Sequence, residues 1–135
     1  MGRAVSLLLP LLGVVILVGC SSKVSKNELP GSYSVTVNGE RQVIDINSNG
    51  TYDNTLYRQN RMVWRYRNRW NYENEAGLGG DAITFDQFQF GLKDYDHGVA
   101  GFWPVKPDRS WSGKLELCFD PDLNNRCFMK ERVST

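Results

Sequence analysis

From residue 32 to residue 133, apolar and polar side chains alternate along the chain in short stretches that are separated by turn residues. Alternation with a period of two is typical of strands that bury one face. Asn38-Gly39 is a strong hairpin signal, because both residues tolerate the positive φ of a type I′ turn. The pattern predicts eight strands, over residues 32–37, 40–47, 51–58, 62–72, 82–90, 99–105, 114–119 and 127–133.

The same region shows no helical pattern, since no stretch places apolar residues at i, i+3, i+4 and i+7 over three turns. An all-β fold is therefore predicted. Eight short antiparallel strands fit a small barrel, and the alternative is a two-sheet β-sandwich. Pro104 and Pro107 bound a stretch that runs to Gly113 and is predicted to be irregular.

The N-terminus departs from the alternation, with an apolar run from Ala4 to Val18 after the single basic Arg3. This run is short for a membrane-spanning helix, which needs about 20 apolar residues, and Pro10 would cost a helix interior roughly 3 kcal/mol. A basic start, a short apolar core and a small residue before a cleavage site are the marks of a secretory signal peptide. Residues 1–19 are predicted to be one.

The run ends in Leu17-Val18-Gly19-Cys20, which resembles the lipobox of bacterial lipoproteins. The resemblance implies that Cys20 is the lipidation site and carries acyl chains such as palmitate. Two or more acyl chains anchor a protein stably in a membrane. Ser21 implies, by the same resemblance, an outer-membrane lipoprotein facing the periplasm if the organism is Gram-negative. The alternative is ordinary cleavage near Gly19, which would leave Cys20 without lipid.

The chain after the signal peptide divides into a Ser/Lys/Asn-rich segment, residues 20–28, and a domain, residues 29–135. The first is predicted to be a flexible tether. Cleavage of the signal peptide would remove Arg3, so the 16 basic residues of the chain would fall to 15. This number equals that of the acidic residues, and the remaining chain would be formally neutral. A neutral domain has no long-range field to attract nucleic acid, so a nucleic-acid partner is not expected.

Cysteine spacing predicts one disulfide. If Cys20 takes lipid, Cys118 and Cys127 are left as an even pair in an oxidising compartment. A turn-rich segment separates them between two short apolar runs, so a bridge across the last hairpin is predicted. Two Cys and the distant His97 fall short of a zinc ligand set, and no metal or cofactor is expected.

Turn and aromatic motifs carry a second resemblance. In chain order, the motifs are Leu29-Pro-Gly-Ser-Tyr33, Ser48-Asn-Gly-Thr-Tyr52, Trp70 and Ile83-Thr-Phe85. They are similar to those of small lipocalin-like lipoprotein domains, and the similarity covers most of residues 29–133. It implies a β-barrel and a small apolar ligand.

The strand predicted over residues 62–72 has two contrasting faces. The aromatic face, predicted to point to the core, carries Met62, Trp64, Tyr66, Trp70 and Tyr72. The other face carries Arg65, Arg67 and Arg69, which we expect in solvent with acidic side chains of neighbouring strands opposite them. The alternative is a surface for an anionic ligand or partner, because Arg is suited to bidentate contact with carboxylate and phosphate.

Several aromatic residues lie toward strand ends and loops, among them Trp103 and Trp111. An eight-stranded barrel leaves little more than side-chain room inside, so these side chains are expected to fill it. The alternative is an apolar pocket or a partner surface, where Trp is enriched.

Catalytic signals are sparse. Asp94, Asp96 and His97 could bind a divalent ion or supply a base, but a polar loop has the same composition. Asp120 to Asn125 lacks the spacing and the closing Glu of a calcium loop. The sequence therefore predicts a non-enzymatic, lipid-anchored envelope protein that binds a protein partner or a small apolar ligand. The alternatives are a periplasmic inhibitor or immunity-type lipoprotein and a metal-dependent enzyme.

Overall fold

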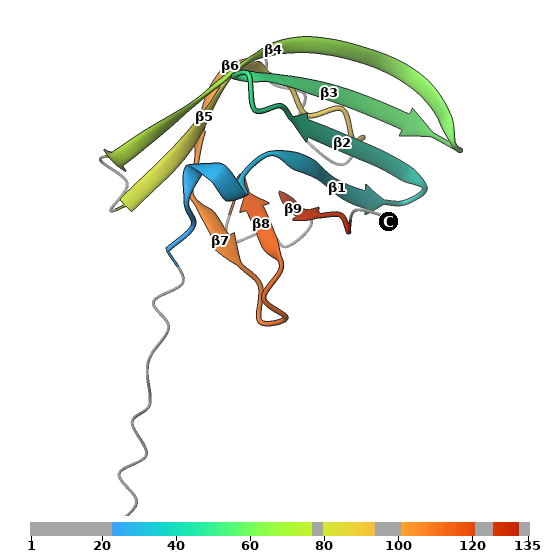
Figure 1. Ribbon diagram of the computed structural model, residues 1–135. Helices are drawn as coiled ribbons and strands as arrows, with labels where there is room; N and C mark the ends of the chain where they lie inside the picture. The colour runs from blue at the N-terminus through green and yellow to red at the C-terminus, as the bar shows by residue number, and fades with distance from the viewer. Residues whose placement is uncertain (1–22, 77–79, 94–100, 121–125, 133–135) are drawn as a thin grey trace, which may run out of the picture.

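A computed structural model of the chain describes residues 23–76, 80–93, 101–120 and 126–132. Its strands form one antiparallel sheet (Figure 1). The elements are a one-turn 3₁₀ helix η1 (Lys26–Glu28) and the strands β1 (Gly31–Val37), β2 (Glu40–Ile46), β3 (Thr51–Arg58), β4 (Arg61–Ala76), β5 (Gly80–Phe88), β6 (Gly101–Val105), β7 (Pro107–Arg109), β8 (Leu115–Cys118) and β9 (Cys127–Lys130).

The sheet curls into a nearly closed barrel. Its strand order is β6-β5-β4-β3-β2-β1-β9-β8-β7, so β6 and β7 are its two edges. These edges are consecutive in the sequence and only Lys106 separates them, so the chain passes directly from one edge to the other. The predicted all-β fold and barrel are confirmed. The prediction of an irregular stretch after Pro107 is wrong at its start, because residues 107–109 pair with β8.

The barrel has two ends that differ in their loops. One end is formed by η1, the β2–β3 turn at residues 47–50, the β7–β8 turn at residues 110–114 and the end of β9. We call it the tether end. The opposite, far end carries the β1–β2 and β3–β4 turns. Asn38 and Gly39 have φ values of 50° and 79°, as a type I′ turn requires.

Aromatic and aliphatic side chains fill the barrel. The largest fully buried ones are Tyr33, Tyr52, Phe85, Phe88, Phe128, Leu29, Ile44, Leu56, Ile83, Leu92 and Leu117. Phe88 is central, since its ring lies 4.5 Å from that of Phe119 and 5.1 Å from that of Phe90, measured between centroids. Phe85 and Phe88 both reach this cluster because the register of β5 shifts between them, so the alternation of β5 is interrupted here.

Residues 89–93, which we call the plug segment, fold back into the far end after β5. Phe90 and Leu92 are buried there. Two buried amides of the barrel wall hold the backbone of the segment: Gln42 and Asn54 both donate to the carbonyl of Gln89, at 2.9 and 3.0 Å. The N–H of Gly91 donates in turn to Gln42 Oε1 at 2.9 Å.

Gly91 leaves no room for a side chain. A Cβ there would lie 2.5 Å from Trp64 Cζ2 and 2.9 Å from Leu56 Cδ2, closer than such atoms approach. The backbone of the plug segment at Gly91 therefore packs directly against aromatic and aliphatic side chains of the barrel wall.

The described part of the predicted tether, residues 23–28, is packed against the barrel, which corrects the expectation of a flexible segment. Val24 is 5% exposed and belongs to the core. η1 is fixed at its start by Glu28, whose carboxylate accepts hydrogen bonds from the backbone N–H and the hydroxyl of Ser25. Cys20 and Ser21 lie outside the described residues. Within these residues, no helix is long and apolar enough to cross a membrane.

Candidate functional site

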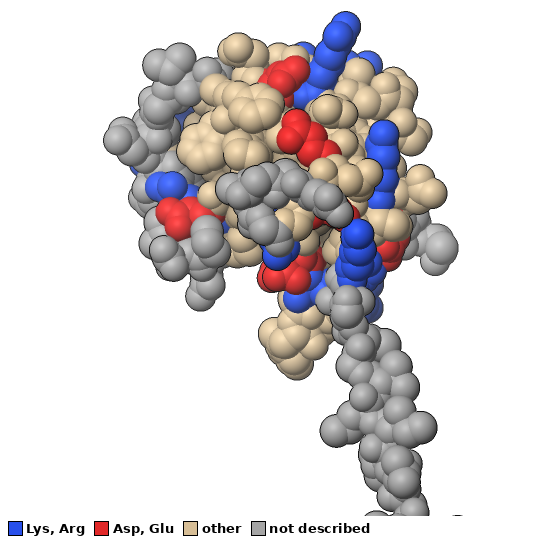
Figure 2. Space-filling model, turned by 90° about the vertical axis from the view of Figure 1, so that its left-hand side faces the viewer, with Lys and Arg blue, Asp and Glu red and all other residues tan. Residues whose placement is uncertain are grey.

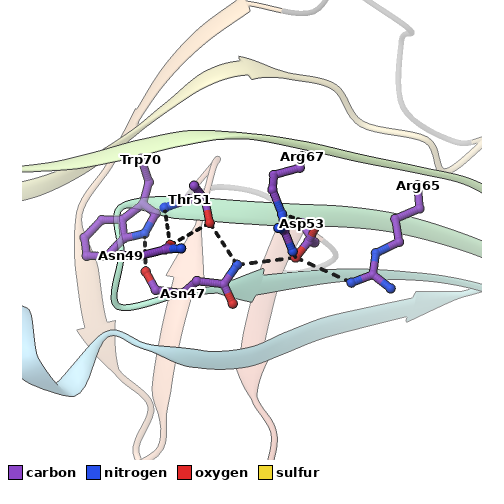
Figure 3. A network of polar contacts seen from close by, with 7 residues as sticks. All are labelled: Asn47, Asn49, Thr51, Asp53, Arg65, Arg67 and Trp70. Atoms are coloured by element: carbon purple, nitrogen blue, oxygen red, sulfur yellow. Dashed lines mark hydrogen bonds and ion pairs between the residues drawn. The ribbon is translucent and has the colours of Figure 1, made fainter.

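The three arginines of β4 point outward, as predicted, and an acidic residue lies opposite them. Asp53 of β3 pairs in register with Arg67. Arg67 donates to both carboxylate oxygens of Asp53, at 3.0 and 2.9 Å, and Arg65 lies 3.4 Å from one of them (Figure 3). The hydrogen bonds from Arg67 hold the pKa of the Asp53 carboxyl below its usual range.

The same carboxylate belongs to a network that fixes the β2–β3 turn. Asn47 donates to Asp53 at 3.3 Å and to the hydroxyl of Thr51 at 3.2 Å. The carbonyl of Asn47 accepts the indole N–H of Trp70 at 2.8 Å (Figure 3). Two of the three arginines are thus engaged in a network that holds strands and a turn together, which favours a structural role over an anion-binding one.

The opposite face of β4 points to the core over most of its length. Trp70 is buried, and Trp64 and Tyr66 are half-buried and stack on each other with centroids 5.4 Å apart. Met62 is the exception to the prediction, because it is 61% exposed. It lies next to the β3–β4 turn, where a register shift between Leu56 and Tyr57 interrupts the regular alternation.

The structure separates the two tryptophans that were predicted to share a surface. Trp103 of β6 is half-buried, and its ring lies 5.4 Å from that of Phe90, edge to face. It fills the far end of the barrel. Trp111 is fully exposed in the β7–β8 turn. Only Trp111 is therefore placed to meet another molecule with its whole side chain.

The predicted disulfide is present in the structure. Cys118 of β8 and Cys127 of β9 are directly opposite each other in the strand register, and their Cα atoms lie 4.0 Å apart. Both are half-buried and lie on the outer side of the sheet, because Leu117 and Phe128 beside them are fully buried. The hairpin that they close forms one wall of a groove.

This groove, of about 850 Å³, lies on the outer face of β6 to β9. Its apolar part consists of Pro104, Phe119, Met129 and the disulfide, and its polar part of Lys106, Asp108, Ser110 and Glu116, with Val105 and Trp111 completing the lining. Apolar lining with a few charged groups is typical of binding sites.

The groove runs along the place where the barrel is not closed. Among the residues that the structure describes, β6 pairs only with β5, and β8 pairs only with β7 and β9. The side of β6 that faces away from β5 is therefore an unpaired sheet edge. Pro104 marks it in the sequence, because proline lacks the N–H of a ladder and is confined to edge strands and bulges.

Apart from Trp111 and the Cys118–Cys127 pair, sequence analysis did not single out the groove residues, although Pro104 carried a usable signal. Asp94, Asp96 and His97, the candidate metal or catalytic residues, lie outside the described residues. Among those described, no group of three or more His, Cys, Asp or Glu side chains could hold a metal ion.

Comparisons of the chain with protein-family models, with curated proteins and with solved structures found no match.

Proposed function

We propose that the protein is a membrane-anchored envelope lipoprotein, without enzymatic activity, that binds a protein partner in the groove beside β6. The observation that carries this proposal is an unpaired strand edge lying in a partly apolar groove. An exposed edge is a template for another strand, and peptide segments are commonly recognised in this way. The side chains of the groove would then provide specificity.

The filled interior favours this site over a ligand inside the barrel. Phe88, Phe90 and Phe128 occupy the central space, and the plug segment closes the far end. A small apolar ligand would have to displace these side chains, which are packed as in any protein core. The outer groove needs no such rearrangement. An inhibitor or immunity-type role would use the same groove, with an enzyme as the partner.

Site-specific photo-crosslinking tests the groove in living cells. A benzophenone amino acid at Lys106, which is exposed in the groove, should give a discrete crosslinked product. The matched control is the same amino acid at Val63 of β4, which is 45% exposed on another part of the wall. Mass spectrometry of the product should map the crosslink to an extended segment of one protein. Equal crosslinking at both positions, or none at Lys106, would contradict the proposal.

The anchor is tested separately by Cys20→Ala. Without lipid on residue 20, we expect the protein to leave the membrane fraction, because the acyl chains supply about 0.8 kcal/mol of membrane affinity per buried CH₂. Cell fractionation after a high-salt wash measures this, and Cys118→Ala serves as the control for loss of a cysteine elsewhere. A Cys20→Ala protein that stays in the washed membranes would show that the anchor is something else.

A further inference from the structure

The tether end of the barrel combines a fully exposed tryptophan with basic side chains that lack an acidic partner among the described residues. Trp111 lies in the turn of the β7–β8 hairpin, which projects at the bottom of the view in Figure 1, on the side where the described chain begins. Lys114 lies in the same turn. A fully exposed Trp is unusual in a folded domain, because its ring loses much of its hydrophobic contribution in water.

The charges of this end are unevenly matched. Three acidic side chains there already have a basic partner: Glu28 pairs with Arg109, Asp81 with Lys23, and Glu131 with Arg41. Lys26, Lys114 and Arg132 form no ion pair with any described residue. Figure 2 shows basic and acidic side chains side by side near the point where the described chain starts. Asp45, Asp108 and Glu116 lie on the nearby strands and likewise form no ion pair with a described residue. The positive charge is therefore local, where Lys114 and Arg132 lie at one pocket.

A pocket of about 510 Å³ lies between η1, the β7–β8 hairpin and the end of β9. Its basic lining residues are Arg109, Lys114, Lys130 and Arg132, and its acidic ones are Glu28 and Glu131. Lys130 reaches inward, where its ammonium donates to the carbonyl of Glu28, and burial lowers the pKa of this ammonium. Lys114 and Arg132 are exposed at the pocket and are available to an anion.

We propose that the tether end docks on the surface of a membrane that contains anionic phospholipid. Trp111 would lie at the level of the headgroups, where an aromatic side chain with one polar atom is favoured. Lys114 and Arg132 would contact lipid phosphates at the pocket, and Lys26 would add to the attraction. The inference rests on the proposed anchor at Cys20, which would hold this end near the bilayer.

Docking of this kind would set the orientation of the barrel. The axis from the tether end to the far end would stand away from the membrane. The groove beside β6 would run along the flank of the barrel, and its end at Ser110 and Trp111 would lie at the membrane. Attachment through the lipid at one residue would not by itself fix this orientation.

Fluorescence quenching tests the proposal with the full chain, purified in detergent and reconstituted into vesicles that contain brominated lipid. The vesicles are either phosphatidylcholine alone or phosphatidylcholine mixed with phosphatidylglycerol. We expect quenching in the mixed vesicles and loss of it in high salt, which screens the charges. Of the four tryptophans, Trp111 should account for the signal, so W111Y abolishes the quenching and W103Y preserves it.

Charge variants provide the matched comparison. K114Q/R132Q should weaken docking about 25-fold, on the basis of roughly fivefold per basic residue at an anionic surface. K93Q/R61Q makes the same change at exposed positions of the far end and should leave docking unchanged. Equal effects of the two double variants, or quenching that does not depend on phosphatidylglycerol, would overturn the proposal.

Flotation of the same vesicles separates docking from anchoring. Protein that floats with both lipid compositions, but is quenched only in the mixed one, supports both proposals. Flotation with the mixed vesicles alone supports docking and contradicts the anchor. Flotation with both compositions without quenching supports the anchor and overturns docking, and flotation with neither overturns both.

Discussion

Replacing Phe88 by Ala is expected to lower the free energy of unfolding by about 3–5 kcal/mol. The side chain is completely buried, and its ring lies within 6.3 Å of the rings of Tyr52, Phe85, Phe90, Phe119 and Phe128, measured between centroids. Removing it leaves a cavity that the strands of a nearly closed barrel cannot easily collapse. A urea melt measures the effect as a lower midpoint with an unchanged slope.

The control for this substitution is Phe102→Ala. Phe102 lies one strand position from the core-facing Trp103, but its side chain is 62% exposed. Its loss should change the free energy of unfolding by less than about 0.5 kcal/mol, as is usual for surface positions. Similar losses in the two variants would mean that the aromatic cluster around Phe88 does not form the core.

Gln42→Leu should destabilise the protein by roughly 2–5 kcal/mol, although the new side chain is similar in size. Gln42 is fully buried and donates to Asn54 Oδ1 and the carbonyl of Gln89, while accepting from the N–H of Gly91. A leucine leaves the N–H of Gly91 and the Asn54 oxygen without partners, and each orphaned buried group costs about 1–3 kcal/mol. Faster hydrogen exchange at Gly91 should accompany the lower stability, because the plug segment loses its attachment to the wall.

Gln89→Leu is the matched control, because it makes the same chemical change within the plug segment. The side chain of Gln89 is exposed, and its backbone carbonyl keeps its bonds to the wall. We expect a change below about 0.5 kcal/mol and unaltered exchange at Gly91. If hydrogen exchange at the Gly91 amide were no faster in Q42L than in Q89L, the plug segment would be held by packing alone.

Several features of the barrel were predictable because they depend on local patterns. The alternation along residues 62–72 placed Arg65, Arg67 and Arg69 outside, since burying three guanidinium groups is far costlier than burying the aromatic face. The Cys118–Cys127 bridge followed from spacing and from the turn-rich segment between them. Positions at strand ends were less predictable: Met62 is exposed because the register shifts beside its turn.

The candidate site depends on long-range pairing, which one sequence does not reveal. Whether β6 has a partner on both sides depends on how far the two edges of the sheet separate. Pro104 indicated an edge, but not that a groove would follow it. Likewise, Gln42 and Asn54 stand at positions that face the core, and only the folded plug segment explains why polar side chains are placed there.

The passage of the chain from one sheet edge to the other also bears on how the barrel assembles. From β1 to β6 and from β7 to β9, each strand pairs with its neighbour in the sequence, so most contacts need only a short loop to close. Between the described strands, β1 and β9 alone pair across the length of the domain, through two residue pairs. Because pairing between sequence neighbours keeps the closing loops short, we expect such a barrel to fold faster than sandwiches with crossed connections. A chain that crosses a membrane before folding would thereby expose its unpaired strands for a shorter time.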